Sequence, residues 1–165
     1  MAESRQIRYA ASNLANALWL EDALADALSW ARWATRQAVP AEWVHPTSWR
    51  CVGNVLLDLG CFRQAIQAYQ LADPAGADPA TRFNQSKALL GLGCFAEAWS
   101  CAETRLALQP PPSGVLPGPY WEGWSHANHL WLWSEQGLGD TLQFVRWLPA
   151  LLATGVSVTL GVQAP

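Results

Sequence analysis

The stretch LGCFRQA at residues 59–65 recurs as LGCFAEA at residues 92–98, an offset of 33 residues. In both copies an apolar helical pattern runs into a glycine, the residue that most readily adopts the left-handed backbone conformation that ends a helix. A phenylalanine follows two residues later, and then a second helical pattern containing alanines, which let two helices pack closely. A recurrence of this length and character predicts consecutive helical hairpins.

The first copy resembles the tetratricopeptide repeat (TPR), a family of helical hairpins about 34 residues long. Its two helices match the TPR pattern of large, small and aromatic residues at Trp49, Val52, Gly53, Leu56, Ala65, Tyr69, Ala72 and Pro74. The second copy keeps Gly93, Phe95, Ala98 and Pro110 but departs from the pattern at Arg82 and Ser86. The resemblance is therefore closest in the middle of the helical region.

The resemblance implies a mainly α fold in residues 1–109, a TPR α-solenoid with hairpins at about 5–40, 46–74 and 79–109. The first hairpin is the weakest match, with its first helix expected to include residues 13–18 and its second to span 22–37. Such repeats bury their apolar faces only against neighbours, and about three suffice for stability. The alternative is an irregular helical bundle in which the similarity between residues 59–65 and 92–98 arose by chance.

Stacked TPRs form a concave groove lined by the first helix of each unit, and TPR proteins commonly hold extended peptides there. The resemblance places Asn16, Asn54 and Lys87 at one groove-facing position, and Asn13 and Asn84 at another, where Cys51 interrupts the series. An asparagine amide offers both a donor and an acceptor to a peptide backbone. A protein or peptide partner is thus expected in this groove. The alternative is that these residues are solvated side chains on exposed helix faces.

The sequence changes character after the repeats. PPPSGVLPGP at residues 110–119 predicts an extended linker, placed at 110–128, because proline fixes φ and removes backbone donors. A short apolar run (129–134), a helical pattern (142–152) and an alternating β-branched run (156–162) then follow. We expect residues 129–165 to form a small β-α-β unit of an incomplete Rossmann-like domain.

The glycine loop between the first strand and the helix contains Gly137 and Gly139. A dinucleotide fingerprint would need a third glycine at position 142, where the sequence has Leu142. A P-loop would need a Gly-Lys-Ser or Gly-Lys-Thr ending, which is missing. Neither phosphate-binding motif fits, and no cofactor is expected.

This region resembles the opening of GT-B glycosyltransferase-like domains related to heptosyltransferases and, more distantly, to O-linked N-acetylglucosamine transferases. The matching residues are Gly137, Gly139, Asp140, Gln143, Phe144, Arg146 and Pro149, with Trp147 in the place of a tyrosine. The resemblance implies that Asp140 lies near the acceptor and is a candidate general base. Asp140 is equally well placed to cap a helix.

A GT-B transferase has two complete α/β domains, whereas this sequence reaches Pro165 just after the second expected strand. We therefore expect a truncated glycosyltransferase-like domain that is not active as this chain. Two hypotheses remain. One is a peptide-binding TPR module. The other is part of a TPR-containing glycosyltransferase that uses a nucleotide-sugar donor, with the donor domain outside this chain.

Composition excludes several other classes. Only 14% of residues are charged, the net charge is −3, and no basic run is present, so we expect no nucleic-acid partner. No apolar stretch reaches the roughly 20 residues of a membrane span, and the polar N-terminus lacks a signal-peptide core, which favours the cytoplasm. Cys51, Cys61, Cys94 and Cys101 form no CxxC pair, and His126 and His129 have only Glu122 nearby, so no metal site is expected.

Overall fold

The computed structural model describes residues 2–36, 45–109, 121, 123, 126–135 and 137–162, and for residues 2–5 it describes only the backbone. Most of the expected linker, and the end of the first expected hairpin, lie outside these residues. The chain divides into two compact units, Met1–Pro110 and Pro111–Pro165. Each unit is described by itself below.

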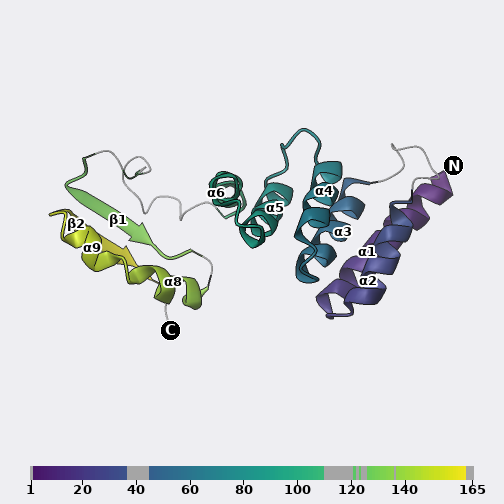
Figure 1. The fold of residues 1–165 in the computed structure, drawn as a ribbon, viewed down its shortest axis with the longest axis horizontal. Helices are drawn as coiled ribbons and strands as arrows, with labels where there is room; N and C mark the ends of the chain where they lie inside the picture. The colour runs from purple at the N-terminus through teal and green to yellow at the C-terminus, as the bar shows by residue number, and fades with distance from the viewer. Residues whose placement is uncertain are drawn as a thin grey trace. The chain divides into compact units, whose positions relative to one another are not determined.

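The first unit consists of successive helical hairpins (Figure 1). The first pairs α1 (Ala2–Leu20) with α2 (Leu24–Ala34), and the second pairs α3 (Pro46–Asp58) with α4 (Phe62–Ala72). The third pairs α5 (Pro79–Gly91) with α6 (Phe95–Ala102), after which the short α7 (Arg105–Leu108) follows. The predicted mainly helical fold is confirmed.

One turn geometry closes all three of these hairpins. Asp22, Gly60 and Gly93 have positive φ angles of 61°, 71° and 76°. In each turn the residue after the positive φ donates its backbone N–H to a carbonyl five residues back, at 2.9, 2.8 and 3.0 Å. The positive-φ residue itself donates to the carbonyl three residues back, at 3.0–3.1 Å. This pair of bonds is the Schellman motif, which satisfies carbonyls left free at a helix end.

Some helix boundaries differ from the sequence-based expectation, among them the end of the helix expected at 22–37, which stops at Ala34. The second helix of the first hairpin begins at Leu24, because Asp22 adopts the left-handed conformation and belongs to the turn. The final helix of the third hairpin stops at Ala102. There the Thr104 hydroxyl donates to the carbonyls of Cys101 (2.7 Å) and Pro79 (3.1 Å), and the chain resumes as α7.

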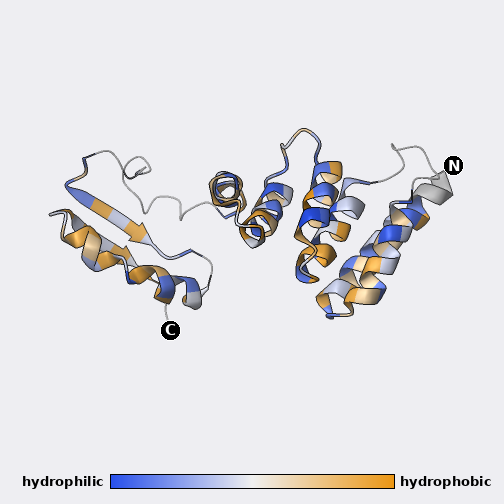
Figure 2. Cartoon of the chain, viewed as in Figure 1, coloured by the Kyte–Doolittle hydropathy of each residue, from blue (hydrophilic) through white to orange (hydrophobic). Residues whose placement is uncertain are grey.

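Small residues allow the two helices of each hairpin to approach closely. Ala27, Ala65 and Ala98, each five residues after the positive-φ residue of its turn, have no exposed surface. In the middle hairpin, a Cβ added at Gly53 would lie 2.6 Å from Cδ1 of Tyr69, so only glycine fits beneath that ring. Figure 2 shows that apolar and polar residues alternate along the helices, as in helices with one buried face.

Successive hairpins pack mainly through the second helix of one and the first helix of the next, and their first helices also touch. α1 contacts α3, and α3 contacts α5, while α2 and α4 each contact the first helix that follows. The buried Ser12 and Ser48 hydroxyls hydrogen-bond across the α1–α3 contact at 2.5 Å. Between α4 and α5 the ring of Phe62 covers Gly91, where an added Cβ would lie 2.6 Å from the ring. The first helices therefore form one continuous row.

The second unit is a β-α-β arrangement. Strands β1 (His129–Trp133) and β2 (Ser157–Gly161) pair in parallel, with Leu130 opposite Val158 and Leu132 opposite Leu160. The predicted small sheet is confirmed. The single expected helix at 142–152 is instead two helices, α8 (Leu138–Val145) and α9 (Leu148–Leu152). Pro149 explains the break, because it has no N–H for Val145 and its ring clashes with that turn.

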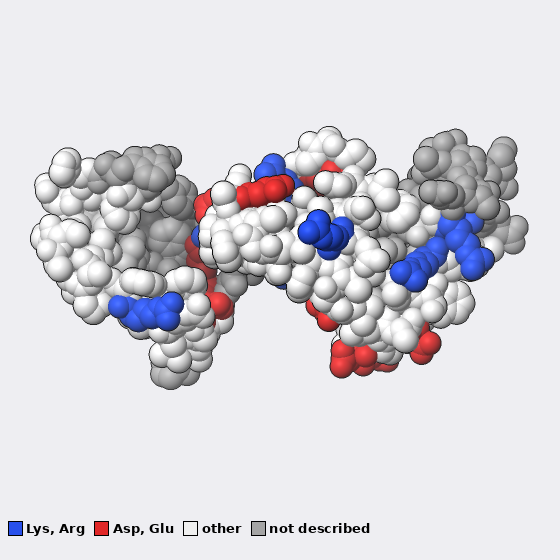
Figure 3. All heavy atoms as spheres, in the orientation of Figure 1, with Lys and Arg blue, Asp and Glu red and all other residues white. Residues whose placement is uncertain are grey.

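No described helix has both the length and the apolar character needed to cross a membrane. On the face shown in Figure 3, Lys and Arg side chains form separate small groups with neutral surface between them. The described residues of the second unit expose large apolar side chains, among them Leu142 at 74% and Trp147 at 60%. In contrast, Leu130 of β1 is buried.

Candidate functional site

The hairpin turns give a common reference for comparing the first helices. Asn16, Asn54 and Lys87 each lie six residues before the positive-φ residue of their turn. Asn13 and Asn84 lie nine residues before it, as does Cys51. These residues therefore occupy two equivalent positions on the adjacent helices α1, α3 and α5.

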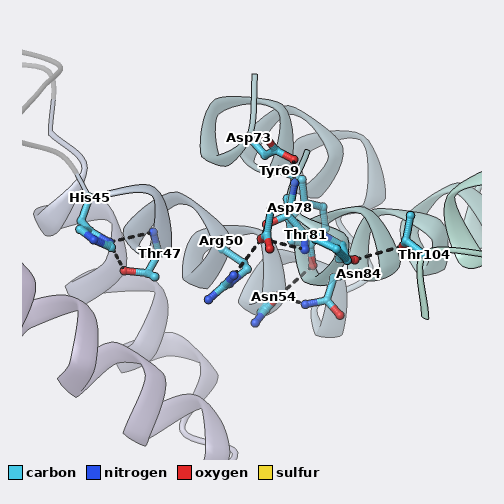
Figure 4. Close-up of polar contacts among 11 residues, drawn as sticks. His45, Thr47, Arg50, Asn54, Tyr69, Asp73, Asp78, Thr81, Asn84 and Thr104 are labelled. Atoms are coloured by element: carbon cyan, nitrogen blue, oxygen red, sulfur yellow. Dashed lines mark hydrogen bonds and ion pairs between the residues drawn. The ribbon is translucent and has the colours of Figure 1, made fainter. Parts of the chain in front are cut away.

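Asn54 and Asn84 are in direct contact. The Asn84 Nδ2 atom donates to the Asn54 Oδ1 atom at 3.0 Å, and the Tyr69 hydroxyl donates to the same oxygen at 3.0 Å (Figure 4). Asn54 is only 9% exposed. The expectation that its amide offers both an acceptor and a donor is thus corrected, because the oxygen is already used. Within the described residues, Nδ2 of Asn54 and Oδ1 of Asn84 make no hydrogen bond.

Tyr69 fixes the orientation of the Asn54 amide. Its side chain is fully buried, and burial, followed by the negative charge of Asp58, raises the pKa of its hydroxyl well above the usual range. The hydroxyl therefore stays protonated at neutral pH and donates to Asn54. Because the Asn54 Oδ1 atom accepts this hydrogen bond, the N–H groups of the Asn54 amide point away from the Tyr69 hydroxyl.

The other candidate residues are exposed. Asn13 and Asn16 on α1 make no side-chain hydrogen bond within the described residues. The Lys87 Nζ atom lies 4.9 Å from the centre of the Phe83 ring, a cation–π contact on the surface of α5. The structure therefore joins one pair of the five candidates, Asn54 and Asn84, and leaves the other three facing solvent.

An ion pair beside this pair of amides was not anticipated. Arg50 of α3 contacts Asp78, the N-cap of α5, with 2.9 Å between Nη1 and Oδ2. Asp78 also accepts hydrogen bonds from the Thr81 backbone N–H (3.1 Å) and hydroxyl (2.5 Å). Partial burial alone would raise the pKa of Asp78, but the bonds from Thr81 and Arg50 outweigh it and hold the pKa below its usual range.

A sequence signal for part of this cluster exists. Aspartate before Pro79, with Thr81 three residues on, is the pattern of a helix start with a side-chain cap and proline in the first turn. No comparable signal indicates Arg50, because its partner lies 28 residues away. The same holds for Trp19 of α1, whose indole N–H donates to Asp58 of α3 at 2.5 Å.

In the second unit, the glycine loop leads directly into α8. Gly137 is the N-cap of this helix, and Gly139 lies inside its first turn, with open space around the position of a Cβ. The Asp140 Oδ2 atom accepts a hydrogen bond from the Gly137 N–H at 3.1 Å. The carboxylate thus caps the helix from its third position, the structural role that the sequence left open beside catalysis.

His129 lies at the edge of the sheet with two hydroxyl neighbours. Its Nδ1 atom is 2.8 Å from the Ser157 hydroxyl, which itself donates to the Asn128 carbonyl at 2.8 Å. Its Nε2 atom is 3.1 Å from the Thr159 hydroxyl. Across the part of the chain that the structure describes, no three His, Cys, Asp or Glu residues are grouped as metal ligands.

The chain is similar to part of a known bacterial protein. Protein FlbA of Caulobacter vibrioides is 32% identical to this chain over 103 residues, which covers 58% of this chain and 17% of FlbA. The chain therefore spans less than a fifth of that relative's length. No protein-family profile matches the chain.

Proposed function

We propose that the helical unit is a TPR-type module that binds an extended segment of a partner protein along α1, α3 and α5. The supporting observation is the shared turn at Asp22, Gly60 and Gly93, which gives three adjacent first helices equivalent positions. Side chains at such positions recur at regular intervals along the row. An extended peptide has regularly spaced backbone groups, which suits recognition by such a repeat.

The polar groups on these helices have complementary roles in this proposal. The exposed amides of Asn13 and Asn16 can each donate to and accept from a peptide backbone. Asn54 supplies only its N–H groups, because its oxygen accepts from both Tyr69 and Asn84, whereas Asn84 keeps its Oδ1 atom and one of its two N–H donors. This pair is held in place before a ligand arrives, which lowers the entropy lost on binding. Lys87 adds a positive charge that favours a peptide with an acidic side chain.

The test starts from the full chain and a display library of random peptides. A selected peptide should bind in fluorescence anisotropy, and Asn16→Ala and Lys87→Ala should each weaken binding about 3- to 10-fold, the value of one surface hydrogen bond or charge contact. Gln70→Ala is the matched control, because Gln70 is an exposed amide on the second helix α4. Equal losses in all three variants would contradict a site on the first helices.

A second function is supported by the β-α-β unit. Its parallel strands are joined by helices, and α8 begins at the glycine turn that follows β1. We propose as the alternative that the chain is part of a TPR-containing glycosyltransferase, in which a nucleotide-sugar donor binds a domain outside this chain. Asp140 would then act beside the acceptor, provided that the acceptor hydroxyl displaces its bond to Gly137.

Thermal-shift measurements separate the two functions, because a ligand that binds the folded state raises the melting temperature. We expect selected peptides to raise the melting temperature of the full chain and a panel of nucleotide-sugars to leave it unchanged. A rise with a nucleotide-sugar would show that a donor site lies within this chain. Asp140→Asn should leave the peptide affinity unchanged, and a large loss would place the turn in the peptide site.

A further inference from the structure

The hydrogen-bonding capacity of the three first helices differs along the row. On α1 the exposed side chains of Asn13 and Asn16 make no hydrogen bond within the described residues, so each amide can both donate and accept. On α5 the Asn84 amide donates to α3 but keeps its Oδ1 atom as an acceptor. Acceptors for the N–H groups of a peptide are therefore present on both outer helices of the row.

The middle helix, α3, offers no such acceptor at the two equivalent positions. Nine residues before Gly60 stands Cys51, which has no amide and is only 4% exposed. Six residues before Gly60 stands Asn54, whose Oδ1 atom accepts from the Tyr69 hydroxyl and from Asn84 Nδ2, each at 3.0 Å. An amide oxygen has two lone pairs, so these two donors use both of them.

The Asn54 Nδ2 atom, in contrast, is available to a ligand. It makes no hydrogen bond within the described residues, and no buried side-chain nitrogen or oxygen among them lacks a partner. The Nδ2 atom must therefore reach the surface. The groups that hold the oxygen belong to the second and third hairpins, so the packing of these hairpins makes Asn54 a donor only.

This asymmetry places a condition on a peptide that crosses α3. A backbone carbonyl that faces Asn54 finds a donor, whereas a backbone N–H in the same place finds no acceptor. An N–H that loses water on binding without gaining a partner weakens the complex. Proline is the genetically encoded residue without a backbone N–H, and its fixed φ suits an extended chain.

We propose that the row of first helices selects an extended segment with proline at the residue that faces Asn54. The inference rests on the peptide binding proposed above and names the chemistry of the partner. The segment presents carbonyl groups without a free N–H opposite α3, and ordinary peptide units opposite α1. The donor-only state of Asn54 sets this preference.

The test uses peptides selected by the full chain from the display library. Proline should be enriched at one position among them, and its replacement by alanine should weaken binding about 3- to 10-fold in fluorescence anisotropy. Lactic acid at that position has an ester oxygen where alanine has its N–H, and it should restore the affinity to within about 2-fold of the proline peptide. An ester peptide that binds as weakly as the alanine peptide would attribute the preference to the proline ring and overturn the proposal.

Asn54→Asp reverses the hydrogen-bonding character of the site at nearly constant shape. One carboxylate oxygen can accept from Tyr69 and Asn84, and the other is an acceptor where Nδ2 was a donor. This variant should bind the alanine peptide more tightly than the ester peptide, the opposite of the unmodified chain. Asn16→Asp, the same change at the equivalent position of α1, is the matched control and should keep the preference for the ester. An unchanged preference in Asn54→Asp would contradict the proposal.

The failure of this inference can be told apart from the failure of peptide binding itself. Selected peptides that are weakened by Asn16→Ala but carry no enriched proline would overturn this inference alone. A chain that binds no peptide would overturn the peptide-binding function as well. Circular dichroism checks that Asn54→Asp keeps its helix content. If it does not, the alanine and ester peptides compared on the unmodified chain test the proposal without the variant.

Discussion

Tyr69 is the largest side chain without exposed surface among the described residues. Its ring lies over Gly53 of the partner helix, and its hydroxyl bonds to Asn54, the next residue along. One side chain thus sets the distance between α3 and α4 and also orients an amide of the candidate site. Stability and binding geometry are coupled at this residue.

Replacing Gly53 with alanine should destabilise the helical unit, because the new Cβ would overlap the Tyr69 ring. We expect a loss of about 1–3 kcal/mol in the free energy of unfolding, measured by urea titration followed by circular dichroism. Gly139→Ala is the matched control, since no atom lies within 4 Å of that Cβ position and its φ is not positive. If Gly53→Ala left the free energy of unfolding unchanged, α3 and α4 would be able to move apart with little loss of stability.

The four cysteines should differ in reactivity according to burial. Burial raises the pKa of the Cys51 thiol from 9.0 to about 11, whereas Cys94 is exposed in the turn before α6. The reactive species is the thiolate. Iodoacetamide at neutral pH should therefore label Cys94 first and Cys51 only after unfolding, as mass spectrometry of the digested protein would show.

The Cys51 pKa also predicts a pH dependence of stability. Above about pH 9 the unfolded chain loses the Cys51 proton while the folded protein keeps it. This ionisation lowers the free energy of the unfolded state relative to the folded state. Stability should fall between about pH 9 and pH 11. Urea titrations at about pH 8 and about pH 10 should show a larger decrease for the unmodified chain than for Cys51→Ala. Equal decreases would assign the effect to other groups.

At the scale of the elements, the hairpin turn is the most regular feature, although different residues form it. Gly60 and Gly93 adopt positive φ without steric cost, while Asp22 adopts it with a Cβ. Asp22→Gly should therefore stabilise the first hairpin by up to about 1 kcal/mol. The reverse change, Gly93→Asp, should destabilise the third by a similar amount. Melting temperatures of the two variants should move in opposite directions.

Much of this fold could be predicted from the sequence, since the glycine turns and alanine positions of the second and third hairpins follow the repeat. The Asp22 turn could not, because aspartate is not specific for left-handed backbone. The break before Pro149 could also have been predicted, because position 149 is interior in the helix expected at 142–152, where proline removes a helical hydrogen bond. The Asn54–Asn84 contact and the Arg50–Asp78 pair depend on how successive hairpins pack, which no local pattern encodes.

For the whole molecule, the division into two units predicts separate folding. Both hydrophobic clusters of the helical unit consist entirely of its own residues, between Ala15 and Cys101. A chain ending at Pro110 should therefore keep its helix content and a melting temperature within a few degrees of the full-length value. Circular dichroism during heating measures both. A large decrease would show that the β-α-β unit contributes to the stability of the hairpins.

The contact between Tyr69 and Gly53 also bears on how the chain avoids mispairing. Sequences as similar as residues 59–65 and 92–98 create a risk that a first helix folds against the wrong second helix. At the positions of Gly53 and Tyr69, the third hairpin has Ser86 and Ala102, and the first has Ala15 and Ala31. Only α3 can accommodate a tyrosine there, so α4 has a single correct partner. The buried ring of Tyr69 thereby restricts which first helix can pair with α4.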